Sequence, residues 1–114
     1  MNLDRIRAHC LSLPHTTEQV QWGDNLVFKI GGKIYAIAAT IPAGRVLSFK
    51  CTPEEFVELT ERPGIFQAPY LAKMQWVALE SFDALTDSEI RRLVTKSYEL
   101  VVAKLPKKAR AGWD

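Results

Sequence analysis

The basic side chains are the residues of this sequence whose types and spacing most clearly suggest a chemistry. Arg91, Arg92 and Lys96 are spaced to share the exposed side of one helix, and further basic residues follow them. Clustered lysine and arginine residues bind phosphate groups, with strong salt dependence and no sequence preference. The predicted nucleic-acid-binding residues are Lys29, Lys33, Arg45, Lys50, Lys73, Arg91, Arg92, Lys96, Lys104, Lys107 and Lys108, and Arg110 continues the same run.

The charges are unevenly distributed along the chain, although the net charge is only +2. Residues 51–90 contain two basic and eight acidic residues, whereas residues 91–114 contain seven basic and two acidic residues. This asymmetry is typical of a protein with an acidic and a basic face, and a basic face suits phosphates. Two solvated faces that serve only solubility are the alternative. The sequence does not show whether the strand and helix lysines share one surface.

Other reactive side chains give weaker patterns. Cys51 directly precedes a predicted helix, where a thiol pKa can be lowered, but no base is evident nearby. Its alternative role is a small apolar residue packed against Phe56. His9 and His15 do not have the spacing of a helical metal pair, and no P-loop, GxGxxG or GxSxG motif occurs. We therefore expect a non-enzymatic protein without catalytic residues, metal or cofactor.

Three predicted helices provide part of the framework for the basic residues. Asn2 can cap the first helix, which Pro14 ends. The stretch "CTPEEF" has the threonine and glutamate of a capping box, and "LTDSEI" repeats this pattern before the last helix. That helix has a predicted buried stripe, and Pro106 closes it. The stripe consists of Ile90, Leu93, Val94, Ser97, Leu100 and Val101.

Four predicted strands provide the rest. In "LVFKIGGKIYAIAA", two β-rich runs flank Gly31-Gly32, which suits a two-residue hairpin turn. A simple two-residue turn pairs Phe28 with Tyr35 and Leu26 with Ile37 on one face. The stretches "RVLSFK" and "MQWVALE" predict two more strands, and "HTTEQVQWGDN" is interpreted as a connector. The element order α-β-β-β-α-β-α favours a two-layer α+β fold, an antiparallel sheet with helices on one face.

The stretch "RPGIFQAPYLAKMQW", residues 62–76, is too apolar for a solvated linker and too rich in proline for a helix. Its apolar side chains predict a cover over the edge of the core. Tyr70 and Lys73 have polar ends, so they could line a binding site instead.

Length and composition indicate one compact domain over residues 1–114, with a frayed tail from about residue 109. The apolar content of 47% is typical of globular proteins, and no run suits a membrane span or a signal peptide. We expect a cytoplasmic protein in which Cys10 and Cys51 are free thiols.

Three segments together resemble the MmcQ/YjbR family: "GDNLVFKIGGKIYA", "PGIFQAPYLAKMQWV" and "SYELVVAKLPKK". The resemblance covers roughly residues 3–108 and implies a CyaY-like (frataxin-like) fold. Members are often labelled DNA-binding by analogy with that fold, and the family offers no established catalytic residues to transfer.

The frataxin analogy also suggests iron binding through clustered carboxylates. The first helix departs from that pattern, because it contains Asp4 beside two arginines. Glu54, Glu58 and Glu61 can share one side of the second helix, but a solvated face explains them better.

Two functional hypotheses follow. The first is a DNA-binding domain that contacts phosphates through the hairpin and last-helix residues, weakly and with strong salt dependence. The second is a small-molecule or protein-interaction module that uses an exposed sheet face around Phe28, Tyr35 and Trp76.

Overall fold

The computed structural model describes residues 1–41, 43–69 and 71–113, and over these residues the chain forms three α-helices and one six-stranded sheet. The helices are α1 (Leu3–Ser12), α2 (Pro53–Thr60) and α3 (Asp87–Ala103), and three short 3-10 helices are η1 (Ala72–Met74), η2 (Phe82–Ala84) and η3 (Lys107–Arg110). The strands are β1 (Thr17–Gln21), β2 (Asn25–Ile30), β3 (Lys33–Ala39), β4 (Leu47–Lys50), β5 (Ile65–Gln67) and β6 (Trp76–Leu79).

The sheet confirms the α+β class, with antiparallel neighbours in the order β1-β2-β3-β4-β6-β5. Both edge strands were missed from sequence. The segment interpreted as a connector contains β1, and the proline-rich stretch contains β5. Each is short, and both bury few side chains, so neither shows the apolar alternation by which a strand is recognised.

The helices begin where their capping residues predict. Thr52 and Glu55 form a reciprocal capping box at α2, and Thr86 and Glu89 form another at α3. Asn2 accepts a hydrogen bond from the backbone N–H of Arg5 and so caps α1. These contacts satisfy backbone donors that the first helical turn leaves without partners.

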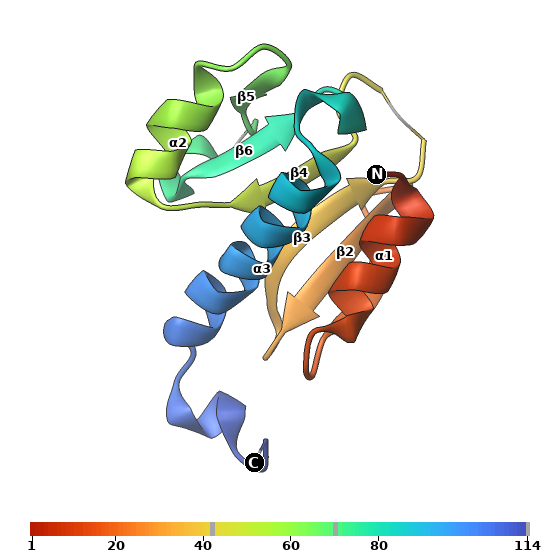
Figure 1. Cartoon of the computed structure of the whole chain (residues 1–114). Helices are drawn as coiled ribbons and strands as arrows, with labels where there is room; N and C mark the ends of the chain where they lie inside the picture. The colour runs from red at the N-terminus through yellow and green to blue at the C-terminus, as the bar shows by residue number, and fades with distance from the viewer. Residues whose placement is uncertain (42, 70, 114) are drawn as a thin grey trace.

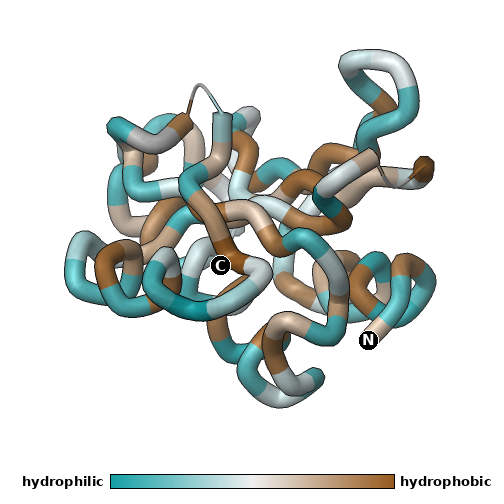
Figure 2. The backbone as a smooth tube through the Cα atoms, turned by 90° about the horizontal axis from the view of Figure 1, so that it is seen from above, coloured by the Kyte–Doolittle hydropathy of each residue, from teal (hydrophilic) through white to brown (hydrophobic). Residues whose placement is uncertain are grey.

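The helices cover one face of the sheet. In Figure 1, α1 and α3 run across the same side of β2 and β3. The main core lies between these layers and includes Ile6 of α1, Leu59 of α2, Val94 of α3 and the strand residues Phe28 and Phe49. Figure 2 shows hydrophobic and hydrophilic stretches alternating along the chain, as expected for elements with one buried side.

The β2–β3 hairpin has the predicted turn but a different register. Gly31 and Gly32 have φ angles of 58° and 81°, as a primed two-residue turn requires. Beyond the turn Lys29 pairs with Ile34, but Phe28 pairs with Ala36. Tyr35 is therefore an extra residue in β3, a bulge that shifts all later pairs by one. The predicted Phe28–Tyr35 and Leu26–Ile37 pairs are wrong for this reason.

Ser97 of α3 fills the gap that the bulge leaves between β3 and β4. The pairing of Ala36 with Phe49 would place Tyr35 opposite Lys50. Instead, the fully buried Ser97 hydroxyl donates to the Tyr35 carbonyl at 2.6 Å and accepts from the Lys50 N–H at 3.0 Å. The helix thus supplies both hydrogen bonds that the strands do not make with each other.

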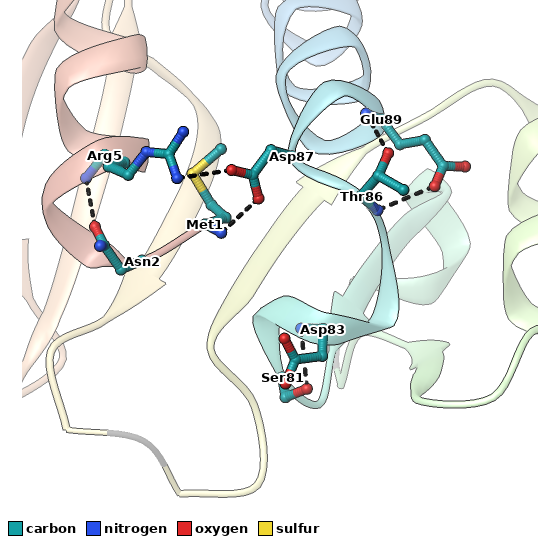
Figure 3. A network of polar contacts seen from close by, with 8 residues as sticks. All are labelled: Met1, Asn2, Arg5, Ser81, Asp83, Thr86, Asp87 and Glu89. Carbon is teal, nitrogen blue, oxygen red and sulfur yellow. Dashed lines mark hydrogen bonds and ion pairs between the residues drawn. The ribbon is translucent and has the colours of Figure 1, made fainter.

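A polar network joins the start of the chain to the start of α3 (Figure 3). Asp87 in the first turn of α3 accepts from the amino group of Met1 and pairs with Arg5 at 2.7 Å. These cations lower the pKa of the Asp87 carboxyl. The network fixes α1 against α3 at one end of the helix layer.

The C-terminal segment, predicted to fray from about residue 109, packs against the rest of the chain as far as it is described. It forms η3, and the Trp113 ring stacks on His15 with centroids 4.7 Å apart. Leu105 is buried and packs closely against Gly31. A Cβ atom added to Gly31 would lie only 2.7 Å from Leu105 Cδ1, so a larger residue there would force the Leu105 side chain to shift.

The Ser97 bridge generates a stability prediction. Ser97→Ala leaves the Tyr35 carbonyl and the Lys50 N–H without a partner, so we expect the free energy of unfolding to fall by about 1–3 kcal/mol in urea denaturation. Ser88→Ala, at an exposed position of the same helix, serves as the control and should change it by less than about 0.5 kcal/mol. Equal effects of the two substitutions on the free energy of unfolding would contradict a stabilising role of the Ser97 hydrogen bonds.

The Glu89 carboxylate generates a pH prediction. Arg62, at 2.8 Å, and the backbone N–H of Thr86 lower the pKa of Glu89 from 4.5 to about 2. A carboxyl with a lowered folded-state pKa stabilises the protein above its unfolded pKa, and this stability is lost as the pH falls through the folded value. The wild type should therefore lose stability between about pH 4.5 and 2.

Glu89→Gln keeps an acceptor for Thr86 but removes the ion pair, so its stability should fall less over that pH range. Because the pair is partly exposed, we expect the free energies of unfolding of the wild type and Glu89→Gln to differ by about 1 kcal/mol or less at neutral pH. Urea denaturation at a series of pH values measures both effects. Glu99→Gln, at an exposed position of α3, is the control and should follow the wild-type curve. Parallel curves for all three proteins would contradict the assignment.

Candidate functional site

The face of the sheet opposite the helices carries a second, smaller apolar cluster. Ala68, Trp76 and Ala78 are buried there, and Ile34, Ile37 and Leu71 pack against them with partial exposure. The buried hydrophobic residues of α1, α2 and α3 belong instead to the main core on the other face. The cover of this cluster comes from the segment between β5 and β6, which carries Ala68 and Leu71. Part of residues 62–76 therefore covers the sheet, as predicted, and part of it forms the wall of a cavity.

A cavity of about 450 Å³ extends from this cluster to the end of α3. We call it the lysine groove, because three lysines line an otherwise mostly apolar hollow. Its lining residues are Trp22, Gly32, Lys33, Ile34, Ile37, Lys50, Leu71, Met74, Trp76, Val101, Lys104 and Leu105. In the part of the chain that the structure describes, no aspartate or glutamate lines it.

The three lysines lie close together because each stands at a terminus of its element, and these termini meet at the same end of the sheet. Lys33 begins β3 after the hairpin turn, and Lys50 ends the antiparallel neighbour β4. Lys104 caps the C-terminus of α3, which Leu105 anchors against Gly31 of the hairpin. The convergence therefore follows from sheet topology and cannot be read from the spacing of the lysines in the sequence.

Lys50 has the most constrained environment of the groove. Its backbone N–H is held by Ser97, and its register partner is Trp76 on β6. Burial lowers the pKa of the half-buried Lys50 amine, and the neighbouring Lys104 ammonium lowers it further. An anionic group placed between these cations would relieve their repulsion.

Trp22 also lines the groove and extends it across the sheet. Trp22 was not predicted from sequence as a site residue, because it lies in the segment interpreted as a connector. It is 64% exposed and has a φ of 52°, in the left-handed region. Besides the lysine groove it lines two further hollows, of about 410 and 400 Å³, and Arg45 lines both. A tryptophan directly before Gly-Asp-Asn was the available signal, since an aromatic residue at a turn is easily left exposed.

The predicted basic residues lie on different surfaces. Lys33, Lys50 and Lys104 meet in the lysine groove, and Arg45 lies farther across the same face. Lys29 is the cross-strand partner of Ile34, and its amine donates to Gln19 at 3.2 Å. Exposed Lys73 lies in η1, between the groove residues Leu71 and Met74.

The remaining predicted residues lie on α3 and η3, outside the lysine groove. Arg91, Arg92 and Lys96 are exposed on α3, away from the buried stripe that faces the sheet. Arg92 lies 3.9 Å from Glu55 of α2, so part of its charge is compensated. Lys107, Lys108 and Arg110 are exposed on η3. Of the residues in the DNA hypothesis, hairpin Lys33 thus lies with Lys104 at the end of α3, whereas Arg91, Arg92 and Lys96 lie outside the groove lining.

The predicted sheet face around Phe28, Tyr35 and Trp76 is wrong in its composition. Phe28 and Tyr35 are fully buried in the main core under the helices, whereas Trp76 belongs to the cluster on the opposite face. The open face instead presents Ile34, Ile37 and Trp22. Tyr70, the other residue proposed for a binding rim, lies outside the described residues.

Cys51 and Cys10 are free and buried, as expected. The Cys51 thiol donates to the Gln75 carbonyl at 3.3 Å, and burial raises its pKa to about 12. This shift is opposite to the lowering that a helix N-terminus could cause.

Over residues 1–41, 43–69 and 71–113, no three histidine, cysteine or acidic side chains gather as a metal site would require. In the same residues, no helix has the length and apolar character needed to span a membrane.

Comparisons with known proteins find relatives of this chain in sequence and in fold. Over 84 residues the chain is 27% identical to the uncharacterised protein YbdF of Escherichia coli O157:H7, covering 72% of this chain and 68% of YbdF. The crystal structure of Deinococcus radiodurans protein DR2400, with a DUF419 domain, is similar with a TM-score of 0.79 and 28% identity, over 97% of this chain and 93% of that one.

A crystal structure of a Pseudomonas syringae protein is also similar, with a TM-score of 0.72 and 25% identity over 88% of this chain and 98% of the other. The sequence model of the YjbR family matches residues 11–100. The chain therefore belongs to the YjbR family, whose function is uncharacterised.

Proposed function

We propose that the protein is a binding module for an organic anion with an apolar body, held in the lysine groove. The observation that carries this proposal is the convergence of Lys33, Lys50 and Lys104 at one end of an apolar hollow. A phosphate or carboxylate would accept charge-assisted hydrogen bonds from these amines. The ligand's apolar part would lie over Ile34, Ile37 and Trp76, where contact removes hydrophobic surface from water.

The shape of the groove favours a small molecule over a polymer. Its cations are concentrated at one end, whereas a nucleic-acid backbone needs contacts spaced along a track. The volume of about 450 Å³ is within the range of small-molecule sites. Trp22, exposed at the other side of the groove, can pack on a flat ring.

DNA binding is the second candidate function. The observation that favours it is the exposure of basic residues on α3 and η3, namely Arg91, Lys96, Lys107, Lys108 and Arg110. Binding there would be non-specific and would weaken steeply as salt rises. It would not involve the lysine groove, so substitutions can separate the two functions.

The test uses 8-anilinonaphthalene-1-sulfonate (ANS), a fluorescent aromatic anion, and N-phenyl-1-naphthylamine, which has the same rings without the sulfonate. Lys33→Gln/Lys50→Gln/Lys104→Gln should weaken ANS binding at least about tenfold, because each charge-assisted hydrogen bond contributes about 1.5–3 kcal/mol. The uncharged probe should bind both proteins equally. Fluorescence titrations measure both affinities, and circular dichroism verifies the fold.

Arg91→Gln/Arg92→Gln/Lys96→Gln is the matched control, since it removes the same charge from the helix side. It should leave ANS binding unchanged. Equal ANS affinity for the wild type and both triple variants would contradict the proposal. Anisotropy titrations of labelled duplex DNA at two salt concentrations complete the comparison. Salt-sensitive DNA binding that only the helix-side variant loses would support the second candidate.

A further inference from the structure

We propose that Lys50 is a nucleophilic amine that forms a reversible imine with an aldehyde or ketone group of the anion in the lysine groove. The inference rests on the proposed function, because the groove must first hold the anion beside Lys50. It adds the chemical class of the ligand, an organic anion that also carries a carbonyl group.

The position of Lys50 supports this assignment. The backbone of Lys50 is fixed on two sides, by the Ser97 hydroxyl at 3.0 Å and by its place in the β4–β6 ladder opposite Trp76. Its side chain lines the cavity together with Ile34, Ile37 and Trp76, which form the apolar floor of the groove. A ligand ring lying on this floor would place a substituent within reach of the Lys50 amine.

The electrostatic environment favours the reactive form. An amine attacks a carbonyl carbon only when it is neutral, and a lysine in an apolar pocket beside another cation is activated in this way. Burial and the Lys104 ammonium both lower the pKa of Lys50. Lys33 and Lys104 are the charged groups that line the same cavity, and both are positive.

The reaction balances without a further reactant. The Lys50 nitrogen lone pair forms the C–N bond as the C=O π bond breaks, and one N–H proton passes to the oxygen to give a neutral carbinolamine. The nitrogen then loses its remaining proton, the hydroxyl leaves as water with a second proton, and the C=N bond forms. Lys104, beside Lys50, is the acid placed to supply the proton to the leaving hydroxyl, and it takes up the proton that the Lys50 nitrogen releases. Addition of water reverses the sequence.

The experiment uses 4-formylbenzoate, a flat anion with an aldehyde, at neutral pH, with cyanoborohydride to reduce any imine to a stable secondary amine. Peptide mass mapping then locates the adduct. We expect modification of Lys50 at least tenfold faster than that of exposed Lys73 or Lys96. Lys50→Arg keeps the positive charge but removes the reactive amine, so it should lose the fast adduct.

The outcomes separate this inference from the proposed function. Wild-type protein that binds ANS in the lysine groove but labels all lysines at similar rates would overturn the imine and leave the proposed function standing. An adduct mainly on Lys33 or Lys104 would also overturn the assignment to Lys50. Fast labelling at Lys50 that excess benzoate suppresses, and that Lys50→Arg abolishes, would support it. Absence of ANS binding in the groove would count against the proposed function itself.

Discussion

The arrangement of this molecule depends on one buried hydroxyl. Because Tyr35 is an extra residue in β3, its carbonyl and the Lys50 N–H cannot form an ordinary ladder pair, and Ser97 bonds to both. The bond to Tyr35 also explains why a polar residue is tolerated in the buried stripe of α3. Through this contact the helix layer fixes where β4 ends, and so where the Lys50 side chain enters the open face. The Ser97 hydroxyl therefore connects Tyr35 of the main core to Lys50 of the lysine groove.

Much of the helical framework could be predicted from sequence. The capping boxes at Thr52 and Thr86 specify helix starts through contacts three residues apart, and the Gly31-Gly32 turn is equally local. The bulge could not be predicted, since the residue that accommodates it is a serine sixty-two positions away from Tyr35. A shift of one residue moves every later side chain to the other face. That is why the expected partner of Phe28 was wrong although the turn was right.

The candidate site was predictable only in part. The sequence predicted a set of basic residues without dividing it, whereas the groove joins Lys33, Lys50 and Lys104 because β3 begins, and β4 and α3 end, at the same end of the sheet. This proximity depends on topology, which a pattern of charges does not contain. The same set also includes the α3 residues, which the helix layer turns toward the opposite side. Trp22 escaped notice because its segment lacks the alternation of a half-buried strand.

The packing of Leu105 against Gly31 has a consequence for how the groove comes into being during synthesis. The floor and the hairpin turn belong to segments that leave the ribosome early, but Val101, Lys104 and Leu105 form one wall of the cavity. A nascent chain that ends before this wall has its sheet residues but only two of the three groove lysines. The cavity is therefore complete only after Val101, Lys104 and Leu105 have been synthesised and have packed against the hairpin.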